Sequence, residues 1–318
     1  MSVTFSDSHT AYTDLHPPTD WNLSEAFDRL MDSGATDALD RVDEKRQWLE
    51  RFMLCDEVPL FTRLETRPDN PTQVRLIVQT DDSSTVPPTL EQIEWVKGEY
   101  TRRFFWDVDM DAVKEALEHH PFGAELAARF HPVRPVNLGD AWSSLLKTVI
   151  ANQIYPGLAT RLNQTLREQY GPRTRFNGEW VYFYPYPDVL AEVQPDQLRP
   201  LSFSRQKADY LPSIGDSVAA NPDTYNWTRL RHTSPEETAT TLLELHGVGK
   251  WTALYIAMRG IAHPNIFIDE QGIRKAIAAG NGLGEKINDS TFQKLTSVYA
   301  PYRTFACYYT YMAHYNAD

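Results

Sequence analysis

The feature that most constrains the fold is a glycine-containing turn, "LHGVGKW", that lies between two helical patterns. The helix before this turn is predicted to begin at Ser234, which is a favourable N-cap. Pro235 suits the first helical turn, and Glu237 can complete a capping box with the N-cap residue. The pattern of this helix ends at His246 and Gly247. The chain is therefore predicted to contain a helical hairpin with a very short connection.

The second helix of this hairpin is predicted to begin near Lys250, so only a few residues remain for the turn. Gly247 and Gly249 lack a Cβ atom and let the backbone turn tightly. Amides of such a turn and of the first turn of the next helix point outward without a partner, and they bind phosphate well. The turn is thus a candidate site for a DNA backbone. An ordinary tight connection between two helices is the alternative.

The composition is that of a globular protein, with 42% hydrophobic residues in 318. A chain of this length is expected to form about two domains, at roughly 150 residues each. No apolar run approaches a membrane span, and the N-terminus "MSVTFSDSHT" lacks the features of a signal peptide. We expect a soluble intracellular protein. Cys55 and Cys307 lie too far apart for metal or cluster spacing, which excludes an iron-sulfur cluster held by four cysteines.

The net charge of −12 argues at first against a polyanionic partner. The acidic excess is confined to residues 1–134, which carry 14 Lys/Arg and 26 Asp/Glu, whereas the remaining 17 basic and 17 acidic residues cancel. The C-terminal part could therefore meet DNA through local geometry rather than through a broad basic surface.

The chain has two parts that differ in their predicted secondary structure. The first contains a predicted helix at residues 23–31, an amphipathic, charge-rich stretch at 38–51, and a further helix at 90–104. It also contains two predicted strands, "PLFTRLET" and "QVRLIVQT", which the turn-rich "RPDNPT" joins as a hairpin. From about Asp111 onward apolar residues recur every three or four positions, so the rest is predicted to be mostly helical.

The predicted fold class is α+β and mostly α, with a small antiparallel sheet at the N-terminus. We expect an N-terminal domain over residues 1–110 and a helical domain over 111–318, which could divide into two helical subdomains. A helix expected from Phe104 to Pro121 could belong to either side of this boundary.

Aromatic and acidic residues follow the glycine turn. Trp251 and Tyr255 stand four residues apart on the second helix, so their rings share a face. A loop then leads to Asp269 and Glu270, which open another helix, "EQGIRKAIAA". These residues favour a DNA-binding turn over an ordinary connection between two helices. The alternatives are core packing for the rings and simple capping of a helix N-terminus for the acids.

These residues resemble the helix-hairpin-helix DNA glycosylases, and among them the 3-methyladenine DNA glycosylase II (AlkA-like) branch. The segment "LHGVGKWTALYIAMRG" is similar to the hairpin of that family. The segment "LLKTVIANQIYPGLATRLNQTLREQYG" looks like its wedge-bearing helix pair, and "YAPYRTFACYYTYMAHY" looks like its closing aromatic helix. The N-terminal part corresponds more weakly to the antiparallel-sheet domain of the family.

The resemblance implies a role for each matching position. An apolar wedge would enter the DNA duplex from Ile154 in the turn "NQIYPG", beside Gln153, unless this isoleucine is buried between two helices. The residues implied to line the base pocket are Trp251, Tyr255, Gln271 and Tyr311. The residues implied to hold a DNA phosphate are Gly247, Gly249, Lys250 and Thr252. The backbone carbonyls implied to bind a monovalent cation, Na⁺ or K⁺, are those of Leu243, Leu245 and Val248. For Phe305, Tyr308 and Met312, core packing is the favoured interpretation.

The resemblance leaves the catalytic carboxylate open between two neighbours. Alignment of the motif D-x-G-[LI]-[RK] with this helix puts Glu270 at the position of the aspartate, and Asp269 lies one residue early. Successive helical side chains point ~100° apart, so both cannot face one pocket without distortion of the helix start. Glu270 could work from an adjusted backbone, Asp269 could take the role by a register shift, or the protein could bind DNA and catalyse little. We rank Glu270 first and Asp269 second.

The function that the resemblance implies is monofunctional excision of damaged purines from double-stranded DNA in base excision repair. Related bifunctional enzymes place a lysine where this chain has Trp251, and Lys250 lies one residue early. The expected substrates are alkylated purines of the 3-methyladenine and 7-methylguanine type, or deaminated purines. The alternative is a DNA-damage-binding protein with weak or lost activity. We expect a monomer without a required cofactor, in the cytoplasm with the nucleoid or in a eukaryotic nucleus.

Overall fold

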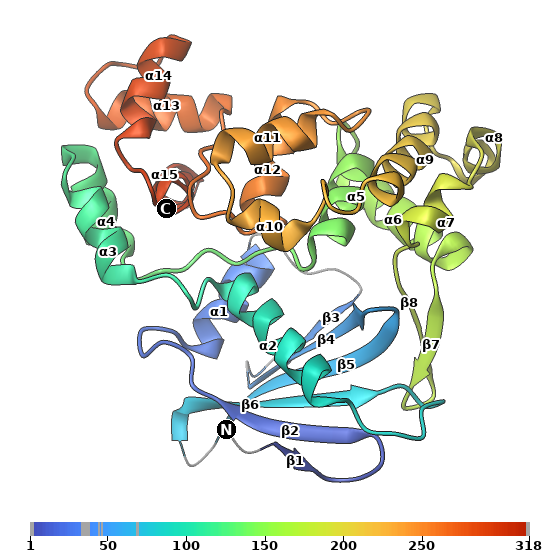
Figure 1. Ribbon diagram of the computed structural model, residues 1–318. Helices are drawn as coiled ribbons and strands as arrows, with labels where there is room; N and C mark the ends of the chain where they lie inside the picture. Colours follow the sequence, from blue (N-terminus) through green and yellow to red (C-terminus); the bar gives the residue numbers. More distant parts are fainter. Residues whose placement is uncertain (1–2, 33–38, 44, 46, 68–69, 316–318) are drawn as a thin grey trace. The chain divides into compact units, whose positions relative to one another are not determined.

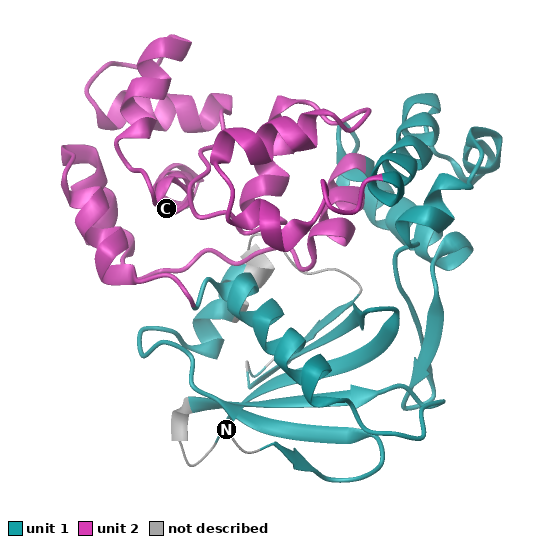
Figure 2. Cartoon of the chain, in the orientation of Figure 1, with its two compact units in different colours: residues 1–106, 150–220 teal, residues 107–149, 221–318 magenta. Residues whose placement is uncertain are grey.

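The computed structural model describes residues 3–315 with the exception of 33–38, 44, 46 and 68–69. The chain forms two compact units, one from residues 1–106 and 150–220 and one from 107–149 and 221–318 (Figure 2). These compact units do not test the predicted domain boundary between residues 110 and 111, which stays a prediction. Within the described residues, no helix is both long enough and apolar enough to cross a membrane.

The first unit is built on an antiparallel sheet of six strands in the order β1-β2-β6-β5-β4-β3 (Figure 1). The strands are β1 Thr4–Phe5, β2 Thr10–Leu15, β3 Asp40–Val42, β4 Trp48–Cys55, β5 Val58–Arg67 and β6 Asn70–Thr80. The predicted hairpin is confirmed, with β5 and β6 in register from the pair Leu60 and Thr80 to the pair Thr66 and Val74, and with a shift of register before the pair Arg67 and Asn70. Its strands extend into the predicted turn, part of which lies outside the described residues.

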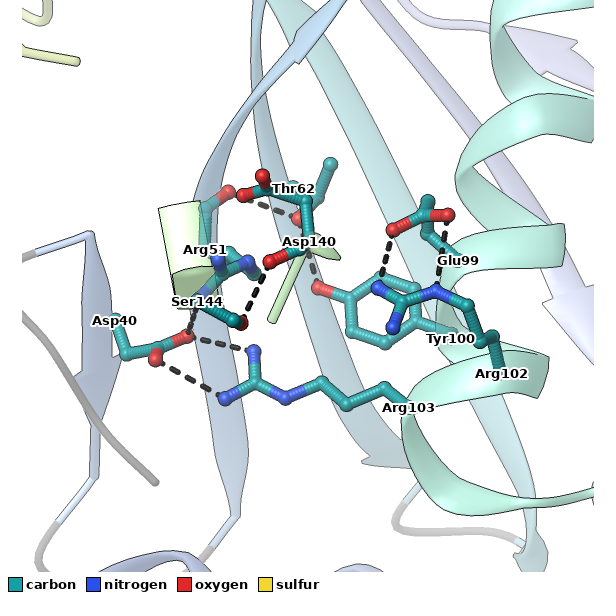
Figure 3. Close-up of polar contacts among 9 residues, drawn as sticks. All are labelled: Asp40, Arg51, Thr62, Glu99, Tyr100, Arg102, Arg103, Asp140 and Ser144. Carbon is teal, nitrogen blue, oxygen red and sulfur yellow. Dashed lines mark hydrogen bonds and ion pairs between the residues drawn. The ribbon is translucent and has the colours of Figure 1, made fainter. Parts of the chain in front are cut away.

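The charge-rich stretch at 38–51 contains β3 and the start of β4. Its charges have a structural use, because Asp40 accepts hydrogen bonds from Arg51 at 2.8 Å and from Arg103 at 2.7 and 3.0 Å (Figure 3). Burial alone would raise the pKa of Asp40, but the two guanidiniums outweigh it and hold this pKa well below its usual range. The cluster fixes the sheet edge to helix α2, Leu90–Phe104, which begins and ends where the sequence predicts.

The predicted helix from Phe104 to Pro121 is wrong at its start. Phe105 has a left-handed backbone with φ of 52° and ends α2. A new helix, α3 at Met110–Glu118, begins after Asp109, whose carboxylate accepts from the amide of Asp111 at 2.9 Å. An N-cap inside the predicted helix therefore divides it.

The rest of the first unit is helical apart from one hairpin. Its elements are α1 Leu23–Asp32, which was predicted, α6 Pro156–Tyr170, β7 Arg173–Phe176, β8 Glu179–Tyr182, α7 Pro187–Ala191, α8 Pro195–Leu198, the 3₁₀ turn η1 Arg199–Leu201 and α9 Arg205–Ala220. The β7–β8 hairpin was not predicted, although its turn is Asn177-Gly178, a pair that favours two-residue hairpin turns. Both residues have positive φ, 51° and 82°. Phe176 of this hairpin packs with Phe52 and Phe61 of the sheet.

In the second unit, all the regular elements of the described residues are helices. After α3 it contains α4 Pro121–Phe130, α5 Ala141–Ala151, α10 Trp227–Arg231, α11 Pro235–Leu243, α12 Lys250–Arg259, α13 Gln271–Gly280, α14 Asp289–Ser297 and α15 Arg303–Tyr315. Phe305 and Tyr308 of α15 are buried, as predicted, and Met312 is half-buried. The chain is thus mostly helical with an N-terminal antiparallel sheet, and the predicted fold class is confirmed.

Candidate DNA-binding and active site

The helical hairpin forms as the sequence predicts. The Ser234 hydroxyl accepts from the Glu237 amide at 3.1 Å and caps α11, but the Glu237 carboxylate pairs with Arg229 at 2.8 Å instead of completing a capping box. Helix α11 ends at Leu243, three residues earlier than predicted, and α12 begins at Lys250. Figure 1 shows the two helices of the hairpin in orange.

The two glycines of the turn have different uses. Gly247 has φ of +87°, a backbone region that favours glycine. Gly249 is the N-cap of α12 with φ of −87°, and a Cβ atom placed there would meet nothing within 4 Å. The free protein therefore has no steric need for a glycine at position 249. A missing side chain at the exposed start of a helix leaves room for another molecule to approach the backbone.

The amides at this turn are available to a ligand. Within the described part of the chain, no hydrogen bond is formed by the amides of Gly247, Gly249 and Lys250. They lie at the positive end of the ten-residue helix α12, which favours an anion. Thr252 is buried, with 4% of its surface exposed, and is the least accessible of the four residues predicted to hold phosphate.

Three of the exposed aromatic rings belong to the second unit. The Trp, Tyr and Phe side chains that are exposed among its described residues are Trp251, Tyr311 and Tyr315. Trp251 stacks on the half-buried Tyr255, with ring centroids 4.8 Å apart and an interplanar angle of 16°. Tyr311 packs against Tyr315 at 4.6 Å. Core packing is therefore wrong for Trp251 and Tyr311, whose surfaces are open to a ligand.

The carboxylate of Asp269 is occupied by cations. Arg274 donates to both of its oxygens, from Nε to Oδ1 at 2.5 Å and from Nη2 to Oδ2 at 2.8 Å. Lys250 lies 3.5 Å from the same Oδ2. The hydrogen bonds from Arg274 lower the pKa of Asp269, against the effect of partial burial. The guanidinium also binds Asp289 of α14 at 2.6 Å, so Asp269 belongs to a network that fixes α13 and α14.

Glu270 is arranged differently from its neighbour. It is the N-cap residue of α13, but its side chain makes no capping hydrogen bond. It forms no ion pair within the described residues. Its Oε1 accepts a hydrogen bond from the phenol of Tyr315 at 3.3 Å. Capping is therefore not the use of this carboxylate, which stays half-buried and free of cations.

Tyr315 was not singled out from the sequence. Burial and the nearby charge of Glu270 raise its pKa, so the phenol keeps its proton and can donate. Gly272 makes room for this contact, because a Cβ atom at position 272 would lie 2.1 Å from the Tyr315 hydroxyl oxygen. A tyrosine 45 residues away could not be assigned to the carboxylate from local spacing.

Helix α15 also holds the loop that leads to the two acids. The Thr304 hydroxyl donates to the His263 carbonyl at 2.6 Å and accepts from the Ile266 amide at 3.1 Å. The Ile268 amide donates to the Cys307 sulfur at 3.4 Å. Positions 304, 307, 311 and 315 are three or four residues apart and share one face of the helix. This face therefore supports the loop from residue 263 to Glu270.

The predicted wedge turn lies in the first unit, between α5 and α6. Ile154 is half-buried, whereas the next residue, Tyr155, is 63% exposed. Gln153 is exposed and has φ of +60°. The buried Lys207 of α9 donates to the Asn152 carbonyl at 2.7 Å and steadies this turn. The inserting role of Ile154 stays a prediction, and Tyr155 is a more exposed neighbour that the sequence did not mark.

The carbonyls predicted to bind a monovalent cation lie at the hairpin, where the Leu245 carbonyl accepts from the Val248 amide at 3.0 Å. A carbonyl has two lone pairs, so this bond still allows a cation. In the described residues, no three His, Cys, Asp or Glu side chains form a group that could hold a metal ion. Cys55 and Cys307 are both buried as free thiols.

Comparison with known proteins identifies relatives over most of the chain. The putative DNA-3-methyladenine glycosylase YfjP of Bacillus subtilis is 25% identical over 89% of this chain and 93% of its own length. Another B. subtilis protein, named DNA-3-methyladenine glycosylase, is 23% identical over 76% of this chain and 79% of its own. DNA-3-methyladenine glycosylase 2 of Escherichia coli is 23% identical over 52% and 55%. No family model matches the chain.

Solved structures share the fold. A 3-methyladenine DNA glycosylase from Archaeoglobus fulgidus aligns over 95% of this chain and 98% of its own, with a TM-score of 0.71 and 16% identity. An 8-oxoguanine glycosylase/lyase of Clostridium acetobutylicum, in complex with double-stranded DNA, aligns over 99% of both chains with a TM-score of 0.65 and 14% identity.

The resemblance seen in the sequence to the helix-hairpin-helix DNA glycosylase superfamily is confirmed by these homologues. The homologues over most of the chain are the AlkA-like 3-methyladenine DNA glycosylases.

Proposed function

We propose that this protein is a monofunctional DNA glycosylase that flips damaged purines out of double-stranded DNA and hydrolyses their N-glycosidic bond, with Glu270 as the catalytic carboxylate. The observation that carries the proposal is the contrast between the two neighbouring acids. Asp269 is neutralised by Arg274, whereas Glu270 is free of cations and oriented by Tyr315. A carboxylate free of cations is the one that can respond to positive charge on a substrate.

The proposed reaction follows from the negative charge of Glu270. As the bond between C1′ and the purine nitrogen breaks, the base leaves with the bonding electrons and the sugar becomes an oxocarbenium cation. The anionic Glu270 stabilises this cation and accepts the proton of the water that adds to C1′. A purine alkylated at N3 or N7 carries a positive charge beforehand, so it leaves as a neutral base and needs no proton. The site is therefore suited above all to 3-methyladenine and 7-methylguanine.

The exposed rings supply the base pocket in this proposal. Trp251, Tyr255 and Tyr311 offer aromatic faces to a flipped base, and Gln271 is exposed at the first position of α13. An aromatic face attracts a cation, so a positively charged purine is held better than an ordinary one. Binding and chemistry then favour the same class of lesion.

The hairpin holds the DNA backbone by its amides. Gly247, Gly249 and Lys250 present unpaired N–H groups, which can bind a phosphate without a basic surface. The carbonyls of Leu243, Leu245 and Val248 would bind Na⁺ or K⁺ beside this phosphate and add positive charge. In the first unit, the turn at Gln153 and Ile154 would fill the space that the flipped nucleotide leaves.

Strand cleavage is not part of the proposed activity. The position of the lysine in bifunctional relatives is occupied by Trp251, and the ammonium group of Lys250 faces Asp269 at 3.5 Å. We propose that the protein acts as a monomer in base excision repair, in whichever compartment holds the DNA, with no cofactor besides the cation.

The test is excision from duplex oligonucleotides that carry 3-methyladenine, 7-methylguanine or hypoxanthine, scored as alkali-labile abasic sites under single-turnover conditions. We expect release of the two alkylated bases to be faster than release of hypoxanthine. Glu270→Gln should lower the rate by about 10²–10⁴-fold, the usual range for a general base. Asp269→Asn should retain excision and serves as the matched control.

Two results would contradict the proposal. If Asp269→Asn stops excision while Glu270→Gln does not, the catalytic carboxylate is Asp269. If the wild-type protein binds lesion DNA and releases no base from any of the three substrates, the protein is a DNA-damage-binding protein without glycosylase activity.

A further inference from the structure

The β7–β8 hairpin of the first unit carries two arginines beside an exposed tryptophan. The guanidinium carbon of Arg175 lies 4.4 Å from the centre of the Trp180 ring, and that of Arg173 lies 4.8 Å from it. Arg175 and Trp180 are directly paired across the two strands. Arg173 is two residues from Arg175 and therefore lies on the same face of the strand. The ring is 46% exposed, and both arginines are exposed.

These two charges are not neutralised by the protein. Among the described residues, no carboxylate pairs with Arg173 or Arg175, and Trp180 is the partner that each guanidinium contacts. The one acid of the hairpin, Glu179, already binds Arg41 of β3 at 2.7 Å. In a chain with a net charge of −12, this strand therefore presents unpaired positive charge.

The hairpin is held rigidly in place. The Asp82 carboxylate accepts from the amides of Asn177 and Gly178, both at 2.8 Å, and the Thr174 hydroxyl donates to Asp81 at 2.6 Å. Phe176 is buried in the core of the sheet. The two arginines thus lie on an ordered hairpin, and this lowers the entropic cost of ordering them when a ligand binds.

A cavity of mixed charge adjoins the ring. Trp180 lines this cavity of about 320 Å³ together with Arg41, Arg167 and Glu168. Arg41 is paired with Glu179, and Arg167 is buried, with its Nε donating to the carbonyl of Asn163 at 3.3 Å. The unpaired positive charge beside the ring is therefore that of Arg173 and Arg175.

We propose that Arg173 and Arg175 bind phosphates of the DNA backbone at a distance from the damaged base, with Trp180 as the platform that keeps both guanidiniums in place. The proposal rests on the proposed DNA-binding function. Arginine forks match phosphate oxygens, and unpaired cations on a rigid strand are complementary to a polyanion. We call this group of residues, Arg173, Arg175 and Trp180, the phosphate strand.

The length of α6 limits where this contact can occur. Helix α6 has 15 residues and separates the turn at Gln153 and Ile154 from the phosphate strand. At about 1.5 Å per residue it is about 22 Å long. With about 3.4 Å for each base pair, this length corresponds to six or seven base pairs. If the turn contacts the flipped nucleotide, the phosphate strand contacts DNA within about seven base pairs of it.

The experiment measures the salt dependence of DNA binding by fluorescence anisotropy. It compares the wild-type protein with Arg173→Gln/Arg175→Gln on an undamaged duplex of about 25 base pairs, between about 50 and 200 mM NaCl. Loss of two phosphate contacts should flatten the slope of log K against log salt by about 1.8, since each contact contributes about 0.9. The affinity of the wild-type protein should then fall about 12-fold more than that of the variant over this range.

Two controls separate charge from folding. Arg173→Lys/Arg175→Lys retains the charges and should keep most of the slope. Lys114→Gln/Arg129→Gln removes the same charge from side chains that already face Glu118 and Glu125, and it should leave the slope unchanged. A melting curve by circular dichroism should show the same midpoint for all variants.

The length of the duplex gives an independent outcome. Lesion duplexes that extend by increasing numbers of base pairs to either side should begin to distinguish the Gln variant from the wild-type protein before they reach about seven pairs, and longer duplexes should add no further difference. Equal slopes on the long duplex would overturn the proposal and leave the phosphate strand to an acidic protein partner. Because binding to undamaged DNA needs no excision, a protein that binds through the phosphate strand but releases no base would contradict the proposed catalysis alone.

Discussion

The hydrogen bond between Tyr315 and Glu270 allows a quantitative test of the proposed catalytic residue. The two oxygens lie 3.3 Å apart, which is long for a bond between two oxygen atoms, and Tyr315 is 49% exposed. We therefore take its contribution as about 1 kcal/mol, below the usual range for a bond to a charged group. If this energy orients Glu270 for reaction, Tyr315→Phe should slow single-turnover excision about fivefold.

The variant Glu270→Asp, which has a shorter side chain, is the background in which Tyr315→Phe is tested again. In Glu270→Asp the carboxylate is withdrawn by one carbon–carbon bond, about 1.5 Å, so it lies beyond hydrogen-bonding distance of the phenol. Tyr315→Phe should then cost nothing further in excision rate. The four proteins form a double-mutant cycle whose coupling energy should be about 1 kcal/mol. Tyr302→Phe is the matched control, because its hydroxyl makes no hydrogen bond to the described residues and its loss should leave the rate unchanged.

The cycle also shows what would refute this reasoning. If Tyr315→Phe slows excision equally in the wild-type protein and in the Glu270→Asp variant, the phenol acts on the substrate or on the fold rather than through Glu270. If it changes the dissociation constant for lesion DNA and leaves the single-turnover rate intact, Tyr315 belongs to binding and not to the orientation of the carboxylate.

Four other substitutions test the carboxylate site and the hairpin turn. Gly272→Ala should place its Cβ against the Tyr315 hydroxyl, lower excision about as much as Tyr315→Phe, and add little to it in the double variant. Asp269→Asn should cost about 1–2 kcal/mol of stability at neutral pH. The pKa of Asp269 is lowered in the folded protein, below its ordinary value of 3.8. The difference in stability between the wild-type protein and the variant should therefore be complete above about pH 5 and vanish as the pH falls through the lowered pKa. Melting curves taken from pH 7 to pH 2 measure it. Gly247→Ala should destabilise the protein by about 1–2 kcal/mol because of its positive φ. Gly249→Ala should leave the melting midpoint nearly unchanged but weaken DNA binding in an anisotropy titration.

Local signals predicted the elements of this fold where the residues themselves determine the structure. Ser234 caps α11, and the predicted strand at residues 59–66 lies within β5. The signal failed where a single residue interrupts a longer pattern. The helix predicted to begin at Phe104 begins only at Met110, because Phe105 has a left-handed backbone and Asp109 is the N-cap. The Asn177-Gly178 pair is a local signal that is sufficient for the β7–β8 hairpin.

The candidate site was predicted as a set of residues but not as a set of contacts. The spacing of Trp251 and Tyr255 on one helix predicted their shared face, and the rings indeed stack. The sequence could not separate Asp269 from Glu270, because both stand at the start of the same helix. The difference arises from partners at other positions, Arg274 across the first turn and Tyr315 on α15. Contacts of this kind depend on how helices pack, and local spacing does not encode them.

The arrangement of the site also accounts for a glutamate where an aspartate was expected. A longer side chain has one more rotatable bond, so it gains reach but loses orientation unless a partner restrains it. Here Tyr315 is that partner, and Gly272 leaves the space that the phenol needs. The acid at position 269 is meanwhile bound by Arg274, which also binds Asp289. In the proposed mechanism the start of α13 therefore separates two roles, because Asp269 serves the structure and Glu270, restrained by Tyr315, serves the reaction.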